Sequence, residues 1–131
     1  MNKNEQFVNK LIELTKTNKM TWLYLDENDE LFSTLNLSPF ERISSTFDYD
    51  EFNSDSSFYA KINSNFIVLY ELRTASENLL SSLRLKTVPS TFKDIQNIEL
   101  TENKELLLRL LNVVKSQFPN SEDIINDILN L

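Results

Sequence analysis

The chain has 131 residues and a formal net charge of -7, and it contains no glycine, cysteine or histidine. These absences exclude an imidazole base, a thiolate nucleophile or zinc ligand, a disulfide framework and a glycine-rich phosphate loop. The length and the 40% apolar content predict one folded domain over residues 1–131.

The first predicted element is a helix over residues 4–17. Asn2 and Glu5 have the spacing of a capping box, with asparagine in the place of serine or threonine. Apolar residues then recur at helical spacing: Phe7, Val8, Leu11 and Ile12. Asn18 follows this helix, and we expect it to end the helix in the left-handed conformation where glycine is usual.

Residues 20–25 are rich in strand formers and predict a strand, in which the only tryptophan, Trp22, is expected to be a packing residue. Residues 26–56 show no clear period and are interrupted by Pro39. We expect a long connection with fragments of structure, including one short helical turn at residues 38–41. Connections of this length are uncommon in compact domains unless they are functional or disordered.

A β-hairpin is predicted over residues 57–62 and 66–73, with residues 63–65 as its turn. Asparagine in the turn can adopt the positive φ angles usually left to glycine. The second strand has apolar side chains on both faces: Phe66, Val68, Tyr70 and Leu72 on one, Ile67 and Leu69 on the other. We therefore expect it to be a central strand that is covered on both sides.

Leucines in residues 79–88 fit a helix or a strand, and the alternation of apolar and basic residues from Leu83 to Lys86 favours a strand that ends at Pro89. Residues 90–100 have an apolar residue at every third position, which suits a short helix or a connection that crosses the sheet without regular structure.

Two amphipathic helices are predicted at the C-terminal end. The first runs from an N-cap at Thr101 to about residue 118, and the second begins at Ser121. We expect the last helix to bury a face made of Ile124, Ile125, Ile128 and Leu129. The fold class that follows is α+β, with an N-terminal helix, an antiparallel sheet of three to four strands, and two C-terminal helices packed on the sheet.

The negative charge is concentrated in residues 26–55. This segment holds nine acidic residues and one basic residue, a net charge of -8, whereas the rest of the chain holds eleven acidic and twelve basic residues, a net charge of +1. Such asymmetry concerns partners rather than fold. It argues against direct nucleic-acid binding, which needs clustered lysine and arginine.

The acidic segment has three interpretations: a solvated loop that serves solubility, a surface for a basic partner protein, and a metal site. The basic partner can be a nucleic-acid-binding protein whose groove the segment blocks. The spacing disfavours a metal site, because an EF-hand loop needs glycine at its sixth position and glutamate at its twelfth. Counted from Asp48 these positions hold Asn53 and Tyr59, and counted from Asp26 they hold two leucines. We therefore expect no metal and no cofactor.

Aromatic residues are interleaved with these acids: Phe32, Phe40, Phe47, Tyr49 and Phe52. A purely solvated loop does not need them. They either pin the segment onto the body of the protein or serve as anchors that a partner buries, and pinning is the favoured interpretation.

The remaining residue types permit a carboxylate pair, a serine–lysine pair or a magnesium site beside a phosphate. None of these stands in a recognisable motif, so we expect no enzyme and no catalytic residue. The apolar runs are too short for a membrane span, and residues 1–5 lack the apolar region of a secretory signal. These features predict a cytoplasmic protein that binds no membrane.

Two terminal stretches, Phe7 to Trp22 (FVNKLIELTKTNKMTW) and Ser116 to Leu131 (SQFPNSEDIINDILNL), together with the hairpin, resemble small uncharacterised α+β proteins of low-GC Gram-positive bacteria and their mobile elements. The resemblance does not extend to the acidic segment, and it implies no activity.

The leading hypothesis is a non-enzymatic binding protein of the inhibitor or immunity kind, which engages a basic partner protein through residues 26–55. The alternative is an oligomeric structural or adaptor protein with the helix at residues 106–118 as its interface, and the third is a metal-dependent or carboxylate enzyme. We expect a monomer or a homodimer. The candidate partner-binding residues are Asp26, Glu27, Asp29, Glu30, Phe47, Asp48, Tyr49, Asp50, Glu51, Phe52 and Asp55.

Overall fold

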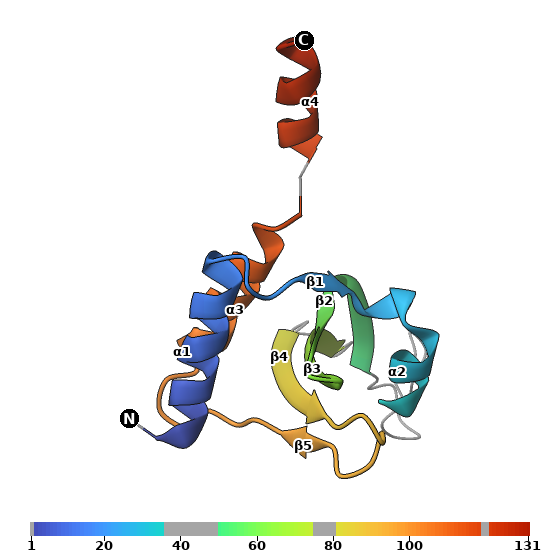
Figure 1. The fold of residues 1–131 in the computed structure, drawn as a ribbon, viewed down its shortest axis with the longest axis vertical. Coiled ribbons are helices and arrows are strands. Elements are labelled where there is room, and N and C mark those ends of the chain that lie inside the picture. The colour runs from blue at the N-terminus through green and yellow to red at the C-terminus, as the bar shows by residue number, and fades with distance from the viewer. Residues whose placement is uncertain (1, 36–49, 75–80, 119–120) are drawn as a thin grey trace.

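The computed structural model describes residues 2–35, 50–74, 81–118 and 121–131 (Figure 1). Within these ranges the helices are α1 (Lys3–Lys16), α2 (Asp29–Thr34), α3 (Glu105–Lys115) and α4 (Ser121–Leu129), with a 3₁₀ turn η1 (Leu25–Glu27) before α2. The strands are β1 (Trp22–Tyr24), β2 (Asp50–Ile62), β3 (Asn65–Thr74), β4 (Ser81–Val88) and β5 (Gln96–Asn97). The predicted α+β class is confirmed.

The described strands form one antiparallel sheet in the order β1-β2-β3-β4-β5, so its five strands slightly exceed the three to four expected. β3 lies in the middle, and both of its faces are buried. Val68 is 0% and Tyr70 is 3% exposed on one face, and Leu69 is 0% exposed on the other. The expectation of a central strand covered on both sides is therefore confirmed.

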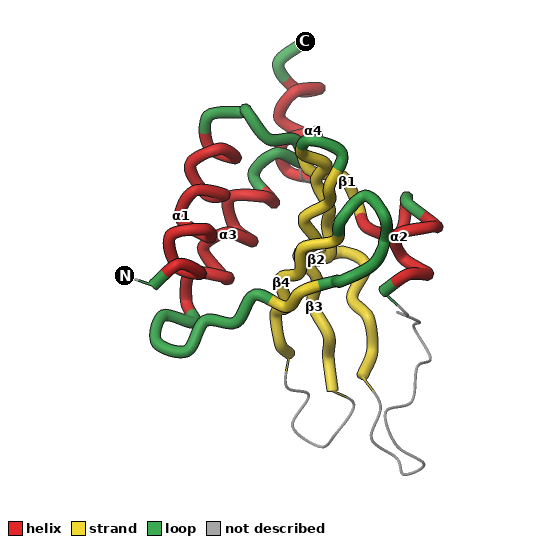
Figure 2. Tube along the Cα trace, turned by 60° about the horizontal axis from the view of Figure 1, so that its bottom comes forward, coloured by secondary structure: helices red, strands yellow, loops and turns green. Residues whose placement is uncertain are grey.

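The first core lies between the sheet and the pair α1 and α3, which run side by side on one face (Figure 2). Its helical residues are Val8, Leu11 and Ile12 of α1 and Leu106, Leu110, Leu111 and Val114 of α3, which pack on residues such as Phe58, Leu69 and Leu85 of the strands. Trp22 is 2% exposed in this core, and its Nε1 donates a hydrogen bond to Thr15 Oγ1 at 3.0 Å. The prediction that Trp22 is a packing residue is confirmed.

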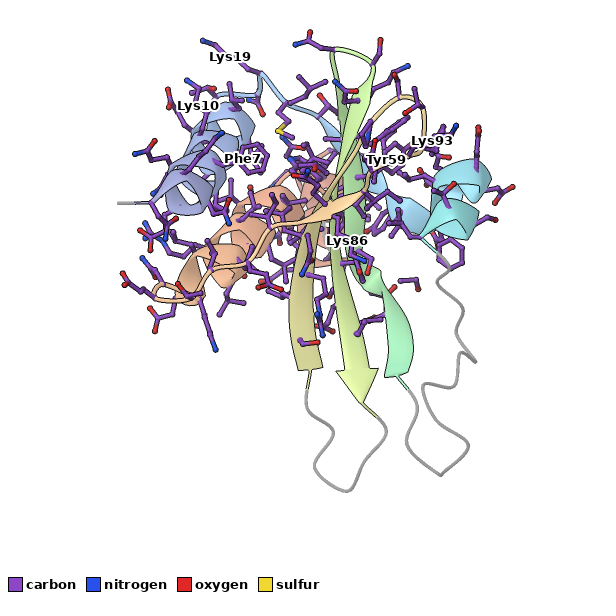
Figure 3. All side chains as sticks on the ribbon, turned by 90° about the horizontal axis from the view of Figure 1, so that it is seen from below. Phe7, Lys10, Lys19, Tyr59, Lys86 and Lys93 are labelled. Carbon is purple, nitrogen blue, oxygen red and sulfur yellow. The ribbon has the colours of Figure 1, made fainter. Side chains whose placement is uncertain are left out.

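The second core lies on the opposite face of the sheet. Its buried residues are Leu25 of η1, Leu31 of α2 and Leu35, together with Val68, Tyr70 and Val88 of the strands. Phe92 and Ile95 pack against them from the irregular crossing between β4 and β5. Figure 3 shows Tyr59 and Lys93 on this side of the sheet and Phe7 of α1 on the other. The first part of the acidic segment thus folds over the sheet, and residues 36–49, including the predicted turn at residues 38–41, lie outside the described ranges.

β2 begins at Asp50, whereas the sequence predicted a strand from residue 57. The register of β2 against β3 shifts between Asn53 and Phe58, which marks a bulge. Ser57 holds this bulge: its Oγ donates to the Asn53 carbonyl at 2.6 Å and accepts the Glu71 amide at 3.2 Å. The bulge breaks the alternation on which the prediction depended, and it buries serine where a strand pattern would place an apolar residue.

The strand predicted within residues 79–88 is confirmed by β4, and the crossing over residues 90–100 is irregular except for the short β5. Two other boundaries differ. The strand at residues 20–25 is shorter, and α3 begins at Glu105 rather than after an N-cap at Thr101. The residues before α3 are held against β4 and the first core, because the Ile98 amide donates to the Leu85 carbonyl at 2.8 Å and Leu100 is 6% exposed in that core.

Asparagine and serine take over the turn positions that glycine commonly fills. Asn18 ends α1 with a φ of 57°, as predicted, while the amides of Asn18 and Lys19 bond to the carbonyls of Thr15 and Leu14 in a Schellman motif. The β2–β3 hairpin is confirmed, and its two-residue loop has a φ of 50° at Asn63 and 72° at Ser64. These are the angles of a type I′ turn, in which glycine is strongly preferred at the second position.

The last helix differs from the expectation. Its apolar side chains are exposed rather than buried: 49% for Ile124, 55% for Ile125, 62% for Ile128 and 76% for Leu129. Figure 1 shows α4 projecting from the end of α3, clear of the sheet. The helices that cover the first core are α1 and α3, and no residue of α4 belongs to that core. None of the described helices is long and apolar enough to span a membrane.

Ser64→Gly is expected to stabilise the protein by about 1 kcal/mol, because a non-glycine residue in the left-handed region carries a steric cost that glycine avoids. Urea unfolding followed by circular dichroism measures the change. The matched control is Ser90→Gly at an exposed turn position without a positive φ, where glycine should be neutral or destabilising. An equal effect of the two substitutions would contradict the turn assignment.

Candidate acidic docking surface

η1 and α2 form a short, well-anchored unit directly after β1. Leu25 and Leu31 are each 0% exposed, and both belong to the second core. Asn28 caps α2, since its Oδ1 accepts the Leu31 amide at 3.0 Å. Asparagine is among the best N-cap residues, and replacing such a cap by alanine typically costs about 1 kcal/mol. The backbone of residues 25–35 is therefore held by packing on one side and by capping at its start.

Four carboxylates project from this unit toward solvent. Asp26 and Glu27 lie in η1, Asp29 and Glu30 lie in the first turn of α2, and all four are exposed. None of them forms an ion pair in the described part of the chain. We call these four residues the η1–α2 acidic surface. Its arrangement follows from the sequence, because the leucines at positions 25, 31 and 35 face inward and the acids between them face outward.

Two of the four acids also have a local structural role. Asp29 and Glu30 occupy the first turn of α2, where a negative charge complements the positive end of the helix dipole. Each such contact is typically worth about 0.3–1 kcal/mol at an exposed site. Asp26 and Glu27 lie in η1, before α2, so the dipole of α2 does not account for them.

The remaining candidate residues lie elsewhere. Asp55 is exposed on the bulge of β2, and the backbone of residues 50–52 forms the start of that strand. Figure 2 shows α2 beside the sheet and the start of β2 at the end of the sheet. Phe47, Asp48 and Tyr49 lie outside the described residues. The acidic segment is therefore divided between two elements, and the structure places four of the eleven candidates together on one.

Of the aromatic residues interleaved with the acids, Phe32 is the one whose side chain the structure describes. Its ring is half-buried and packs against the second core. Phe32 therefore pins α2 onto the sheet, as the favoured interpretation expected.

The described residues contain no group of three or more acidic side chains placed to hold a metal ion. A hollow of about 760 Å³ lies elsewhere, between the start of α3 and strands β4 and β5. We call it the α3–β4 groove. Its lining includes four apolar residues, Leu83, Ile98, Leu107 and Leu108, and four charged ones of both signs, Glu71, Glu99, Arg84 and Lys104. The groove was not predictable from the sequence, because its lining comes from β3, β4, β5, α3 and the chain between β5 and α3, which share no motif.

No family model, curated protein or solved structure matches this chain. The resemblance to small proteins of low-GC Gram-positive bacteria therefore stays a prediction.

Leu31→Ala is expected to destabilise the protein by about 2–5 kcal/mol, because it removes a fully buried side chain of the second core and leaves a cavity beside β3. The free energy of unfolding in urea measures the change. Leu23→Ala, at a residue that is 45% exposed, is the matched control and should cost less than about 1 kcal/mol. Equal, small losses would mean that α2 does not cover the sheet in solution.

Proposed function

We propose that this protein is a non-enzymatic binding protein of the inhibitor or immunity kind, which engages a basic partner protein through the η1–α2 acidic surface. The observation that carries the proposal is the presentation of Asp26, Glu27, Asp29 and Glu30, exposed and without ion pairs in the described part of the chain, on a frame whose leucines are buried.

The fixed backbone of residues 25–35 favours tight binding. A mobile acidic loop would lose conformational freedom on binding, and that loss lowers affinity. Residues 25–35 are held by the second core and by the Asn28 cap before any partner arrives. Carboxylates on such a frame raise the association rate with a cationic surface, and this effect weakens steeply with salt.

The spacing of the charges suits a partner that ordinarily binds nucleic acid. Residues 26–30 span about 9 Å along the chain, given rises of about 1.5–2 Å for the helical residues and about 3.3 Å at Asn28, which is extended. Four charges over this length give about one charge per 2 Å, close to the about 1.7 Å per charge along duplex DNA. A protein whose lysine and arginine side chains cluster to bind phosphate would therefore encounter a comparable density of negative charge on the η1–α2 acidic surface.

The structure does not favour the alternative of an oligomer built on the helix at residues 106–118. Leu106, Leu110 and Val114 of α3 are at most 1% exposed and belong to the first core. That apolar stripe is already occupied within the chain.

Neutralising the acidic surface is expected to weaken binding to a cationic probe. The test variant carries Asp26→Asn, Glu27→Gln, Asp29→Asn and Glu30→Gln. The control variant carries Glu13→Gln, Glu102→Gln, Glu105→Gln and Glu122→Gln at exposed positions on other elements. Both variants change the net charge from -7 to -3, so any difference between them reports position rather than total charge.

Fluorescence anisotropy with a labelled oligolysine peptide, titrated at about 50 and about 300 mM NaCl, measures the affinity and its salt dependence. We expect the test variant to bind at least about tenfold more weakly at low salt, with a flatter salt dependence, and the control variant to lose less than about threefold. Equal losses in the two variants would contradict the proposal, because the effect would then be one of bulk charge.

A further inference from the structure

A second hollow lies beside the η1–α2 acidic surface, where β1 meets the closed end of the β2–β3 hairpin. Its volume of about 530 Å³ falls in the range of sites that accept a large side chain. We call it the hairpin pocket. Asn28, which stands between Glu27 and Asp29, lines this pocket, so the pocket and the acidic surface are contiguous. Figure 1 shows β1 leading directly toward α2.

The floor of the hairpin pocket is apolar and partly open to solvent. Trp22 and Tyr24 of β1 pack in the first core, so Leu23 between them lies on the opposite face of the sheet, the face of the second core. Leu23 is 45% exposed and is the register partner of Tyr59. The Tyr59 ring lies 6.1 Å from the Phe66 ring, and both rings are half-buried. These three side chains form an apolar surface that solvent reaches.

The charge of the hairpin pocket is opposite to that of the surface beside it. Lys19 and Lys61 line the pocket and are exposed, and none of the described residues that line it is acidic. Neither lysine forms an ion pair in the described ranges. Lys61 Nζ lies 6.0 Å from the centroid of the Phe66 ring, so this charge stands over the apolar floor. Two surfaces of opposite sign therefore lie next to each other.

An acidic surface alone does not account for tight binding. Exposed charges mainly raise the association rate, whereas a few aromatic or apolar side chains in pockets supply most of the binding energy of an interface. Among the exposed large apolar side chains of the described chain, Leu23 is the one beside the η1–α2 acidic surface. The others belong to α3 and to residues 124–131. The hairpin pocket is therefore the place where a partner held by the acidic surface can bury an anchor.

We propose that the basic partner inserts an aromatic side chain into the hairpin pocket, with a carboxylate beside it that pairs with Lys19 and Lys61, while its own lysines and arginines face the η1–α2 acidic surface. This inference rests on the proposed function and adds the order of the partner's groups, a cationic cluster followed by an aromatic and an acidic group. The two lysines repel a partner whose cationic groups continue over the pocket, which fixes the register of the bound segment.

Labelled peptides provide the first test. The full peptide has four lysines, a linker of one to four glycines, a phenylalanine and a glutamate, and it is made in both chain directions. The control peptide has alanine in place of the phenylalanine and therefore the same charge. Fluorescence anisotropy with the native protein is expected to show at least about fivefold tighter binding of the full peptide for one linker length and direction. No gain over the alanine peptide at any length in either direction would overturn the proposal.

Truncation of a leucine identifies where the phenylalanine binds. Leu23→Ala is expected to reduce the advantage of the full peptide over the alanine peptide at least about threefold, with binding of the alanine peptide unchanged within about twofold. Leu108→Ala, at a leucine of α3 that is 52% exposed, is the matched control and should retain the advantage. A full advantage in Leu23→Ala, or an equal loss in Leu108→Ala, would place the phenylalanine elsewhere and contradict the proposal.

Charge reversal tests the two lysines. The test variant carries Lys19→Glu with Lys61→Glu, and the control carries Lys3→Glu with Lys104→Glu at exposed positions on the α1 and α3 side. Both variants change the net charge from -7 to -11. A further peptide has lysine in place of the glutamate beside the phenylalanine. Relative to the control variant, the test variant should shift the ratio of the two affinities at least about tenfold toward the lysine peptide. Equal ratios in the two variants would contradict the pairing.

Failure of this inference is distinguishable from failure of the proposed function. If neutralising the η1–α2 acidic surface weakens oligolysine binding specifically and the phenylalanine adds nothing, only the inference fails. If that neutralisation has no specific effect, both fail. Sedimentation velocity tests another occupant. A native dimer that Lys19→Glu with Lys61→Glu dissociates, and that the control variant leaves intact, would assign the hairpin pocket to a second copy of the chain and overturn the proposal.

Discussion

The fold depends on the burial of β3 on both faces. Val68 and Tyr70 on one side and Ile67 and Leu69 on the other are at most 8% exposed, so the sheet needs a layer on each side. Burying each such side chain is worth about 1.5–3 kcal/mol, a large part of the net stability of a domain. α1 and α3 supply one layer, and η1, α2 and the crossing after β4 supply the other.

The acidic surface is a consequence of this double burial. After β1 the chain runs along the second face of the sheet, where Leu25, Leu31 and Leu35 are buried, and the four acids between Leu25 and Leu31 are exposed to solvent. The backbone that carries these acids is held in place because η1 and α2 cover the second core. Fold and proposed function are therefore connected through the same eleven residues, 25–35, in which the leucines stabilise the fold and the carboxylates form the proposed recognition surface.

Local patterns predicted the elements that local interactions determine. The capping of α1 by Asn2, the left-handed Asn18 and the β2–β3 hairpin each depend on neighbouring residues, and each was predictable. The start of β2 was not, because a bulge that buries Ser56 and Ser57 has no period. The exposure of the apolar face of α4 was not predictable either. α3 and α4 have similar amphipathic patterns, and a pattern shows which side is apolar without showing what covers it. The acidic site was visible as a charge asymmetry, but its division between α2 and β2 depends on the path of the whole chain.

Amide hydrogen exchange at α2, followed by NMR, tests most directly whether the acidic segment is a structural layer of the sheet. The Phe32 amide bonds to the Asn28 carbonyl at 2.9 Å and the Leu35 amide bonds to the Leu31 carbonyl at 3.1 Å. If α2 seals the second core, both amides exchange at least about a thousandfold more slowly than in an unstructured chain. Exchange at the unstructured rate, while the amides of β3 stay protected, would contradict the account, because the carboxylates would then lie on a loop that the core does not hold.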